Sequence, residues 1–525
     1  MHPGRRNGQI SKRSGQSGLG PQVYRRRLRR YLQRADDSKF LQMLWCVDAL
    51  HSDRAAAAEA INFRFDPALA TQSLAAHRVF AWELDTLANE LLITPKEAAR
   101  SGRQLLLDCS HYGTALECAR ALRKLENAQD RRSLDRVGVI SEMHRLTQRQ
   151  FEWQWGFADL PTLYRSVRLF GQGSSGAYFE ETHGLTVSDF VYLGLILCRA
   201  FFGKPVWKAS SPLEQYGVDD RTRRRGLARL AITMDDARAW ACEKCHPKLH
   251  TAYRPSVLRE HPILLTGERS QIMMAPIVGL LFQRVTQGLY LDVVGGGLAV
   301  WQTIGKEFER YAFELLTAML PGSTVAPERR YRIRKNQFDG PDIEISRNDR
   351  IELLVECKAK RLTFEARFSE NPLDDAGEAY AEIIKGVFQI WRFASRVRRG
   401  LVPGAVLAER PVGMVITLDP WLTMANDQGR EVMAAARRMC AEKEPDLTDQ
   451  DFCPILFTSV RELERCQLLG SEESFFATIA KGSDGDHEAW LFSVIHDEVA
   501  PEKDEPRDYP FADDVKRLLP WWPKI

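Results

Sequence analysis

The spacing of apolar residues changes near the middle of the chain. Between about residues 38 and 293, apolar residues recur three and four positions apart, for example in 40–50, 79–92 and 116–125. This spacing is typical of amphipathic helices, so we predict a mainly helical region at 23–295. Three successive glycines at 295–297 then interrupt the pattern. Because glycine is unfavourable inside a helix, we expect a domain boundary there.

After the glycines, the pattern predicts helices that alternate with strands. The predicted helices are 305–320, 374–399, 428–442 and 461–469, and the predicted strands are 331–334, 342–345, 351–358, 413–418 and 455–460. Such a mixture of hairpin and crossover units indicates an α/β domain with a central mixed sheet at 300–470. Residues 471–525 would form a C-terminal extension. The fold class that follows is α+β and multidomain, with a helical N-terminal region.

The strands 342–345 and 351–358 are predicted to form an antiparallel hairpin with its turn centred near Asp349. In that register Asp342 lies opposite Glu356, and residues of equal parity share a face. The odd face is apolar and carries Ile343, Ile345, Ile351, Leu353, Val355 and Cys357, whereas the even face carries Asp342, Glu344, Glu352, Glu356 and Lys358 around Leu354. Alternation alone is equally compatible with a solvated face, so the even face is either surface or a polar site.

A carboxylate in the preceding helix favours a polar site. In the helix predicted at 305–320, the apolar stripe consists of Phe308, Ala312, Leu315 and Met319. Glu309 is expected at the edge of this stripe, whereas Glu307 belongs to the opposite side. A carboxylate at the edge of a core needs a partner, and a metal ion shared with Asp342 and Glu356 would supply one.

These residues resemble the PD-(D/E)xK nuclease superfamily. Gly305, Phe308 and Glu309 come first in a helix, Pro341-Asp342 follows, and Glu356-Cys357-Lys358 completes the motif in the order of that family. Gln389 with Phe393 is similar to the glutamine motif of its exonuclease-like branches. The resemblance covers about 305–469 and implies a restriction-endonuclease-like domain.

The resemblance implies a metal-dependent deoxyribonuclease, an endonuclease rather than an exonuclease, in phage defence or DNA repair. Asp342 and Glu356 would ligate Mg²⁺, or Mn²⁺ in its place, with the carbonyl oxygen of Cys357 as a further ligand. Glu309 would either bind the ion through water or hold a second ion. Lys358 would orient the attacking water, and a dry site would lower its pKa. The alternative is an inactive nuclease-fold protein that binds nucleic acid or serves as a scaffold. The intact motif favours the enzyme.

Basic residues occur before and after the motif, where a polyanionic substrate would need them. The expected DNA-contacting residues are Arg332, Arg334, Lys335, Lys360, Arg361, Arg367, Lys385, Arg392 and Arg396. Each alone is better explained as a solvated charge, and it is their convergence around the carboxylate cluster that favours a polyanionic substrate. The helical region would then serve recognition or regulation, and the partners would be DNA together with a second copy of the chain or other defence proteins.

Composition adds the cellular setting. The 525 residues carry a net charge of only +3, so nucleic-acid binding has to come from local clusters such as Tyr24–Arg34. Residues 1–22 lack an apolar stretch, which indicates a disordered basic arm and no secretory signal. Together with ten scattered cysteines, this favours the cytoplasm. The apolar runs 190–198 and 272–282 fall short of the roughly 18 to 20 residues of a membrane span, so no membrane association is expected.

Two further motifs are interpreted as structural features rather than as binding or catalytic sites. Cys242, Cys245 and His250 have a zinc-like spacing, but the fourth ligand is missing, so we expect packing thiols rather than a zinc site. Thr233 and Asp236 are expected to cap the helix that carries these cysteines. The glycine-rich segment 170–179 lacks the lysine of a phosphate-binding loop, and we predict an ordinary loop.

Overall fold

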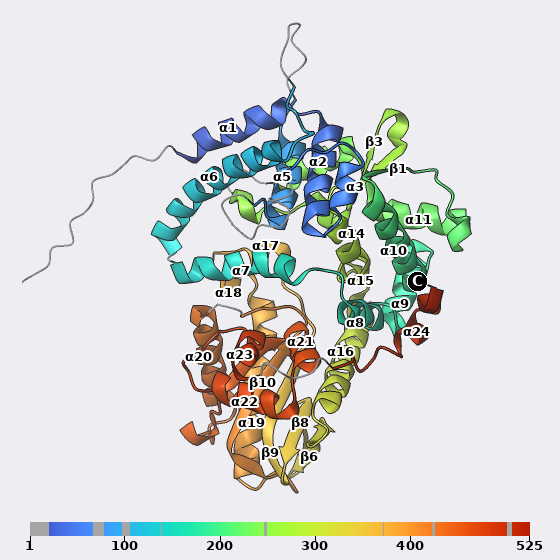
Figure 1. Cartoon of the computed structure of the whole chain (residues 1–525). Helices are drawn as coiled ribbons and strands as arrows, with labels where there is room; N and C mark the ends of the chain where they lie inside the picture. The colour runs from blue at the N-terminus through green and yellow to red at the C-terminus, as the bar shows by residue number, and fades with distance from the viewer. Residues whose placement is uncertain are drawn as a thin grey trace, which may run out of the picture.

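The computed structural model describes residues 20–66, 78–96, 106–137, 139–245, 249–370, 372–422, 426–500 and 507–524. A helical region and a region built on a five-stranded sheet lie side by side, and the long helix α16 (Gly297–Met319) runs from one to the other (Figure 1). The arm expected at 1–22 falls almost entirely outside these ranges. The basic segment at Tyr24–Arg34 lies in α1 (Pro21–Gln33) except for Arg34, which caps the helix, and α1 buries Leu28 and Leu32.

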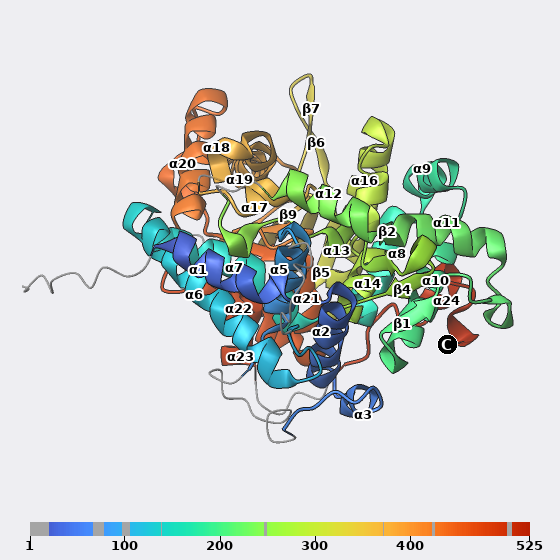
Figure 2. The same ribbon diagram turned by 90° about the horizontal axis from the view of Figure 1, so that it is seen from above.

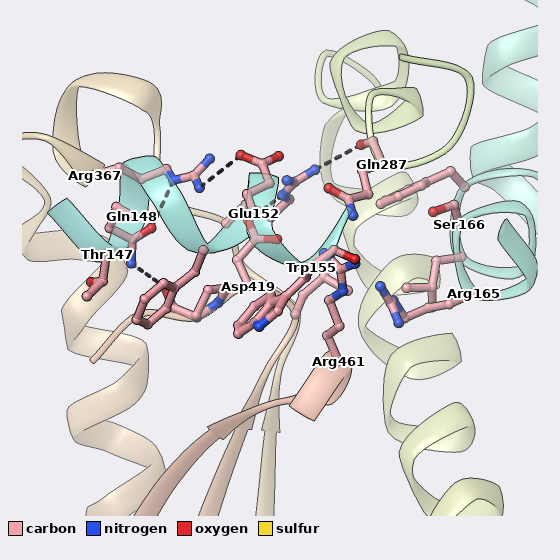
Figure 3. A pocket seen from close by; sticks show the side chains of 16 residues that line it. Thr147, Gln148, Glu152, Trp155, Arg165, Ser166, Gln287, Arg367, Asp419 and Arg461 are labelled. Atoms are coloured by element: carbon pink, nitrogen blue, oxygen red, sulfur yellow. Dashed lines mark hydrogen bonds and ion pairs between the residues drawn. The ribbon is translucent and has the colours of Figure 1, made fainter. Parts of the chain in front are cut away.

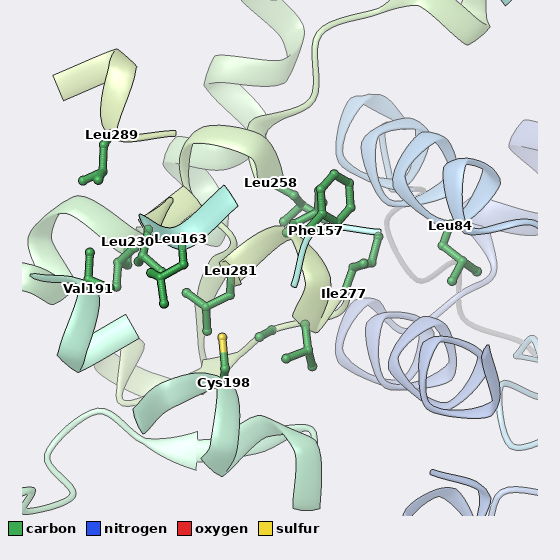
Figure 4. Close-up of a cluster of buried hydrophobic side chains, with 14 of the residues drawn as sticks. Leu84, Phe157, Leu163, Val191, Cys198, Leu230, Leu258, Ile277, Leu281 and Leu289 are labelled. Atoms are coloured by element: carbon green, nitrogen blue, oxygen red, sulfur yellow. The ribbon is translucent and has the colours of Figure 1, made fainter. Parts of the chain in front are cut away.

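The N-terminal region is mainly helical, as the apolar spacing predicts. Its further helices are α2 (Asp37–His51), α3 (Ala55–Glu59), α5 (Ala81–Ile93), α6 (Tyr112–Val137), α7 (Val139–Trp155), α8 (Leu160–Phe170), α9 (Gly173–His183), α10 (Val187–Gly203), α11 (Asp220–Leu230), α12 (Met234–Lys244), α13 (Val257–Glu260), α14 (Val278–Val285) and α15 (Leu289–Val293). They pack around a shared apolar core in which Leu163 of α8, Cys198 of α10 and Leu281 of α14 come together (Figure 4).

A small sheet in this region was not predicted. Its order is β1-β4-β3-β2, and its strands are β1 (Val206–Lys208), β2 (Ala231–Thr233), β3 (Ile263–Thr266) and β4 (Ile272–Met274). Each strand has only three or four residues. Strands of this length are too short to show a period of two in the sequence.

Most of the glycine-rich segment 170–179 is helical, with a turn of two residues between the end of α8 at Phe170 and the start of α9, so the predicted loop is wrong. Helix α9 begins at Gly173, and a Cβ atom at Gly176 would lie 2.4 Å from the carbonyl oxygen of Gly171. The glycines allow the chain to double back tightly between α8 and α9. They serve packing between two helices rather than flexibility.

Helix α16 connects the two regions without a linker. It begins at Gly297, earlier than predicted, because the glycines close a tight turn after α15 in which Gly297 has a φ of 73°. Helix α16 packs against α8 and α9 on one side of this junction and against the sheet on the other. Its predicted stripe, including Phe308 and Leu315, is buried, and one hydrophobic core continues from the helical region to one face of the sheet.

The C-terminal region contains the mixed sheet that the pattern predicts. Its order is β11-β10-β9-β8-β5, with β5 (Thr324–Pro327), β8 (Ile343–Arg347), β9 (Arg350–Lys358), β10 (Leu407–Thr417) and β11 (Ile455–Ser459). Strand β9 is antiparallel to β8 and parallel to β10. Helices α16 and α21 (Val460–Leu469) cover one face, and α19 (Gly377–Arg398), backed by α20 (Asn426–Lys443), covers the other. The central strand β9 is therefore enclosed on both faces.

The remaining short elements surround this sheet. Strands β6 (Arg330–Ile333) and β7 (Asn336–Asp339) form a separate hairpin that projects from the molecule (Figure 2). Helices α17 (Phe364–Arg367) and α18 (Pro372–Asp375) follow β9, and α22 (Glu472–Gly482), α23 (Phe492–Val499) and α24 (Val515–Leu518) form the C-terminal extension. The extension returns to the helical region, where Phe511 stacks on Tyr164 at a centroid distance of 5.2 Å.

The hairpin of β8 and β9 differs from the prediction at its turn. The register Ile343 to Val355 and Ile345 to Leu353 is centred on Asp349 as predicted, but it shifts at the next pair, where Ser346 lies opposite Ile351. The extra residue of this β-bulge is Glu352. Ile351 consequently joins the core on the face of Leu354, not the odd face to which simple alternation assigned it.

No single helix in the described ranges is long and apolar enough to cross a membrane. Helices α9 and α10 reach the length and hydropathy of a membrane span only when taken together, and they are bent by 68° relative to each other. The apolar side chains of α10, among them Phe190 and Leu193, lie in the core of the helical region.

Candidate active site

Asp342 and the end of β9 form the centre of the candidate site. Asp342 directly precedes β8, and continuing the ladder beyond the Ile343 to Val355 pair places it opposite Glu356, as predicted. The backbone N–H of Cys357 donates a hydrogen bond to Asp342 Oδ2 at 2.7 Å. This bond fixes one carboxylate oxygen of Asp342 against the backbone of β9.

Glu356 and Lys358 are buried together on the face of β9 that α19 covers. The Glu356 side chain is 0% exposed, and its Oε2 lies 2.8 Å from Lys358 Nζ, whose side chain is 13% exposed. The other oxygen, Oε1, is buried without a hydrogen-bond partner among the described residues. An ionised carboxylate in this position has unused capacity for a cation.

The three carboxyl groups of the motif share one ammonium group. Burial raises the pKa of Glu356 to about 8, although Lys358 opposes the shift. Burial also raises the pKa of Asp342, and partial burial together with the charge of Asp342 raises the pKa of Glu309 to about 7. Because the carboxyl groups disfavour one another's ionised forms, the site gains from any added positive charge.

Lys358 does not have the lowered pKa expected from a dry site. Burial alone would lower the pKa of Lys358, but the neighbouring carboxylates of Glu356 and Asp342 outweigh it and raise this pKa above its ordinary value. Lys358 is therefore a persistent cation at neutral pH rather than a candidate general base.

Glu309 lies on the exposed side of α16, not at the edge of the buried stripe as predicted. Its electrostatic neighbours are nevertheless those of the site, since Asp342 raises its pKa and Lys358 lowers it. Glu307 has different partners, namely Arg310 and, at 3.6 Å, Arg168. The helix thus directs Glu309 toward the motif and engages Glu307 in ion pairs.

Two residues near the site were not identified from the sequence. Gly386 of α19 lies against the motif, because a Cβ atom there would be 3.0 Å from Lys358 Cε and 3.5 Å from Glu356 Cβ. A glycine inside a predicted long helix was the available signal. Glu328, which follows β5, has a pKa raised by burial and by the charges of Asp339 and Asp342. Its only sequence signal is its proximity to the motif.

Gln389, one turn after Gly386 on α19, is half-buried, and its Oε1 has no hydrogen-bond partner in the described part of the chain.

The other acids of the hairpin form ion pairs outside the motif. Glu344 is buried and receives hydrogen bonds from Arg329 at 2.9 to 3.2 Å, and Glu352 pairs with Arg347 at 2.5 Å. Glu344, which is buried, and Glu352, which is half-exposed, therefore have counterions of their own, and Glu356 is the glutamate of β9 that belongs to the motif.

The basic residues expected to contact DNA fall into two groups. Five of them are exposed, namely Arg332, Arg334, Lys335, Lys360 and Lys385. The others are engaged by protein groups. Arg361 pairs with Asp419 at 2.6 Å, Arg396 is buried and pairs with Glu444, Arg367 donates to Gln148 Oε1 at 3.2 Å, and Arg392 lies over the Phe388 ring. The sequence could not separate these groups, because the partners of Arg361, Arg367 and Arg396 are distant along the chain.

The donors at the motif suit a hard cation such as Mg²⁺. Asp342 and Glu356 offer carboxylate oxygens, and Glu356 Oε1 is the unpartnered one. No trio of His, Cys, Asp or Glu side chains within the described ranges is already gathered to hold a metal ion.

Cys242 and Cys245 lie in different environments. Cys242 is exposed, whereas Cys245 is buried and its Sγ lies 3.1 Å from Asn89 Nδ2. Thr233 caps their helix as predicted, accepting from the N–H of Asp236.

Comparison with known proteins adds no relative. The chain matches no protein-family model, no curated protein and no solved structure.

Proposed function

We propose that this protein is a Mg²⁺-dependent nuclease of the PD-(D/E)xK type that hydrolyses phosphodiester bonds of DNA. The observation that carries the proposal is the buried Glu356, whose Oε2 is paired with Lys358 while its Oε1 is unpartnered, with Asp342 opposite it across the hairpin. A carboxylate buried in this way is costly for stability unless a ligand uses it.

The chemistry requires a charged phosphate to be attacked by water. Bound Mg²⁺ would neutralise the phosphate and lower the pKa of a bound water molecule. Asp342 and Glu356 would hold the ion, with the carbonyl oxygen of Cys357 and a water-mediated contact from Glu309. Lys358, as a lasting cation, would orient the attacking water and stabilise the charge that grows on the phosphate oxygens. Its raised pKa supports an electrostatic role and not proton abstraction.

The exposed cations support a polyanionic substrate. Arg332, Arg334 and Lys335 lie on the β6–β7 hairpin, and Lys360 and Lys385 lie on the segments that follow β9. A duplex contacted by both groups would cross the motif, and neutralising several phosphates would make its binding salt-dependent. We propose DNA in phage defence or repair in the cytoplasm, on the strength of the family resemblance.

Cleavage by matched lysine variants tests the proposal. Lys358→Ala should reduce Mg²⁺-dependent cleavage of plasmid and linear DNA by about 100-fold or more, as expected when a group that stabilises transition-state charge is removed. Lys360→Ala, which changes an exposed lysine two positions away, should retain cleavage within about threefold because it contributes only phosphate contact.

Equal cleavage by wild type and Lys358→Ala would refute the assignment of Lys358. Binding of DNA by a wild type that cleaves neither DNA nor RNA with Mg²⁺ or Mn²⁺ would instead identify an inactive binding protein.

A further inference from the structure

One cluster of arginines is enclosed by the protein and cannot contact DNA. Four arginines line a narrow cavity of about 50 Å³ between α7 and the carboxyl ends of β9 and β10 (Figure 3). They are Arg165, Arg361, Arg367 and Arg461. Their side chains are only 5 to 17% exposed, and two of them pair closely with Glu464 and Asp419. A nucleic acid therefore has to be held by cations on the surface.

The β6–β7 hairpin carries exposed cations that are free of ion pairs. Arg332, Arg334 and Lys335 are exposed on it. The hairpin contains one ion pair, between Arg330 and Asp339 at 3.6 Å, and no other ion pair within the described ranges involves residues 330–339. Because this pair lies at the base, the uncompensated positive charge is concentrated toward the tip.

The opposite face of the hairpin holds it against the protein. The rings of Tyr331 and Phe338 stack with their centroids 5.9 Å apart. Arg396 of α19 lies with its Cζ 3.9 Å from the centroid of Phe338 and donates to the Tyr331 hydroxyl at 3.1 Å. The hairpin is thus fixed in direction, and Arg332 and Gln337, which lie opposite each other, remain exposed to solvent.

The base of the hairpin adjoins the candidate active site. The N–H of Gly340 donates to the carbonyl oxygen of Arg329 at 2.8 Å and closes the hairpin two residues before Asp342. Glu328, just before the hairpin, has a pKa raised by burial and by the charges of Asp339 and Asp342, so these carboxyl groups are close together. A nucleic acid held by the hairpin would consequently pass over Asp342.

The size of the hairpin matches the major groove of B-form DNA. Each strand has four residues, and at roughly 3.4 Å per residue it spans about 14 Å. The major groove is about 12 Å wide and about 8.5 Å deep and admits a two-stranded ribbon, whereas the minor groove is only about 6 Å wide. The major groove of A-form RNA is too narrow for side chains to read.

The tip of the hairpin has an unusual backbone. Arg334 is the first residue of a two-residue turn and has a φ of 56°, in the left-handed region that favours glycine. A long cationic side chain is thus kept at a position where glycine would be less strained. Strain of this kind is typical of positions that are used in function.

We propose that the β6–β7 hairpin enters the major groove of a DNA duplex and places the duplex on the motif, with Arg332, Arg334 and Gln337 toward the base edges. Arginine and glutamine can each form two hydrogen bonds with a purine in that groove. This contact rests on the proposed nuclease function, since it describes how that site holds its substrate, but it is measured by binding without cleavage.

Fluorescence anisotropy of the full chain, with Ca²⁺ in place of Mg²⁺ and the probes checked for integrity on gels, tests the proposal. The reference probe is a DNA duplex of about 20 base pairs, or two helical turns. It is compared with the RNA duplex and the single DNA strand of the same sequence, and with the DNA duplex containing glucosylated hydroxymethylcytosine. The glucose is attached at C5, which faces the major groove, and fills that groove. We expect the unmodified duplex to bind at least about tenfold more tightly than each of the others.

Arg334→Gly is the decisive variant. Glycine relieves the left-handed backbone, so the melting temperature should not fall, while binding of the DNA duplex should weaken by about fivefold or more. Arg332→Ala and Gln337→Ala should weaken it similarly. Arg221→Ala is the matched control, since it removes an exposed arginine from α11 in the helical region, and it should bind as wild type does.

Four results would overturn the proposal: no binding of any probe, equal binding of the DNA and RNA duplexes, equal binding of the glucosylated duplex, and unchanged binding by Arg334→Gly. The test is separable from that of the nuclease. Groove-dependent binding by a wild type that cleaves no nucleic acid would refute the nuclease and support the groove contact. Cleavage of DNA with unimpaired binding by the hairpin variants would refute the groove contact alone.

Discussion

Glu356 is the residue whose environment most constrains the interpretation of the site. It lies on a strand enclosed on both faces, with no exposed surface and with one oxygen paired to Lys358. Buried ion pairs of this kind contribute little net stability, because desolvation of both charges offsets their attraction. Their presence is better explained by a ligand or reaction that uses the charges.

The raised pKa of Glu356 predicts a pH-dependent stability. In the unfolded chain this carboxyl ionises near its ordinary value of about 4.3, whereas in the folded protein its pKa is about 8. Between these values unfolding releases a proton, so the free energy of unfolding should fall as the pH rises from about 5 to 8 and level off above. The slope should be on the order of 1 kcal/mol per pH unit. Urea unfolding in EDTA at pH 5 to 9 measures it.

Two comparisons make this pH test specific. Glu356→Gln removes this ionisable group and should make the slope smaller, with the remaining slope due to other acids of raised pKa such as Asp342 and Glu309. Glu352→Gln, which alters a half-exposed acid of the same strand, should leave the slope unchanged. Added Mg²⁺ should raise the stability of wild type most at high pH, since the metal requires the ionised carboxylate. A wild-type profile that rises from pH 5 to 8 would contradict the burial of an acid here.

At the residue scale, the sequence predicts which residues lie opposite each other on the hairpin better than it predicts their electrostatic environment. The position of Asp342 opposite Glu356 follows from alternation and the turn, both of which are local. The pKa direction of Lys358, by contrast, depends on how many carboxylates gather around it in space. The partners of Arg361 and Arg396, Asp419 and Glu444, are likewise remote in sequence. Ion pairs between residues that are far apart along the chain leave no periodic signal in the sequence.

At the scale of elements, the approach of α19 to β9 depends on Gly386. Alanine there would gain up to about 1 kcal/mol in helix propensity, but its Cβ would lie 3.0 Å from Lys358 Cε. We therefore expect Gly386→Ala to change the free energy of unfolding by less than about 1 kcal/mol. Because the lysine must move, cleavage should fall by about tenfold or more, since small misplacements of a catalytic group are costly.

Gly429→Ala is the control for this helix substitution. Gly429 lies in α20, and a Cβ atom there would meet nothing within 4 Å. It should stabilise the protein by up to about 1 kcal/mol and leave cleavage unchanged. Full activity of Gly386→Ala in the same assay would show that Lys358 tolerates displacement.

The elements of the sheet region could be predicted because their patterns are strong and local. Strands β8 to β11 and helices α19 to α21 occur where the alternation and the helical spacing place them. The bulge at Glu352 could not be predicted, because one extra residue leaves the composition of the strand unchanged. The segment 170–179 was misassigned because its glycines permit close packing, which has the same composition as a loop.

At the scale of the whole molecule, the two regions share their interior. One hydrophobic core includes side chains of the helical region, of α16 and of one sheet face. Arg165 of α8 forms a buried ion pair with Glu464 of α21, which also accepts from the Tyr311 hydroxyl of α16. The C-terminal residues then pack back on α8 through Phe511. The division expected from the glycines at 295–297 therefore does not correspond to a gap in packing.

This shared interior predicts that residues 300–470 do not fold alone. The fragment would expose the stripe of α16 and the sheet face beneath it, and it would separate Glu464 from Arg165, which costs about 3–5 kcal/mol for a buried pair. That loss is a large part of the roughly 5–15 kcal/mol by which domains are stable. The full chain should melt in one cooperative transition by calorimetry and circular dichroism, and the fragment should show none. Residues 20–296 and 297–524 produced together as two chains should associate and recover the transition. A cooperative melt of the isolated fragment would instead show that the helical region is an independent addition to a self-sufficient domain.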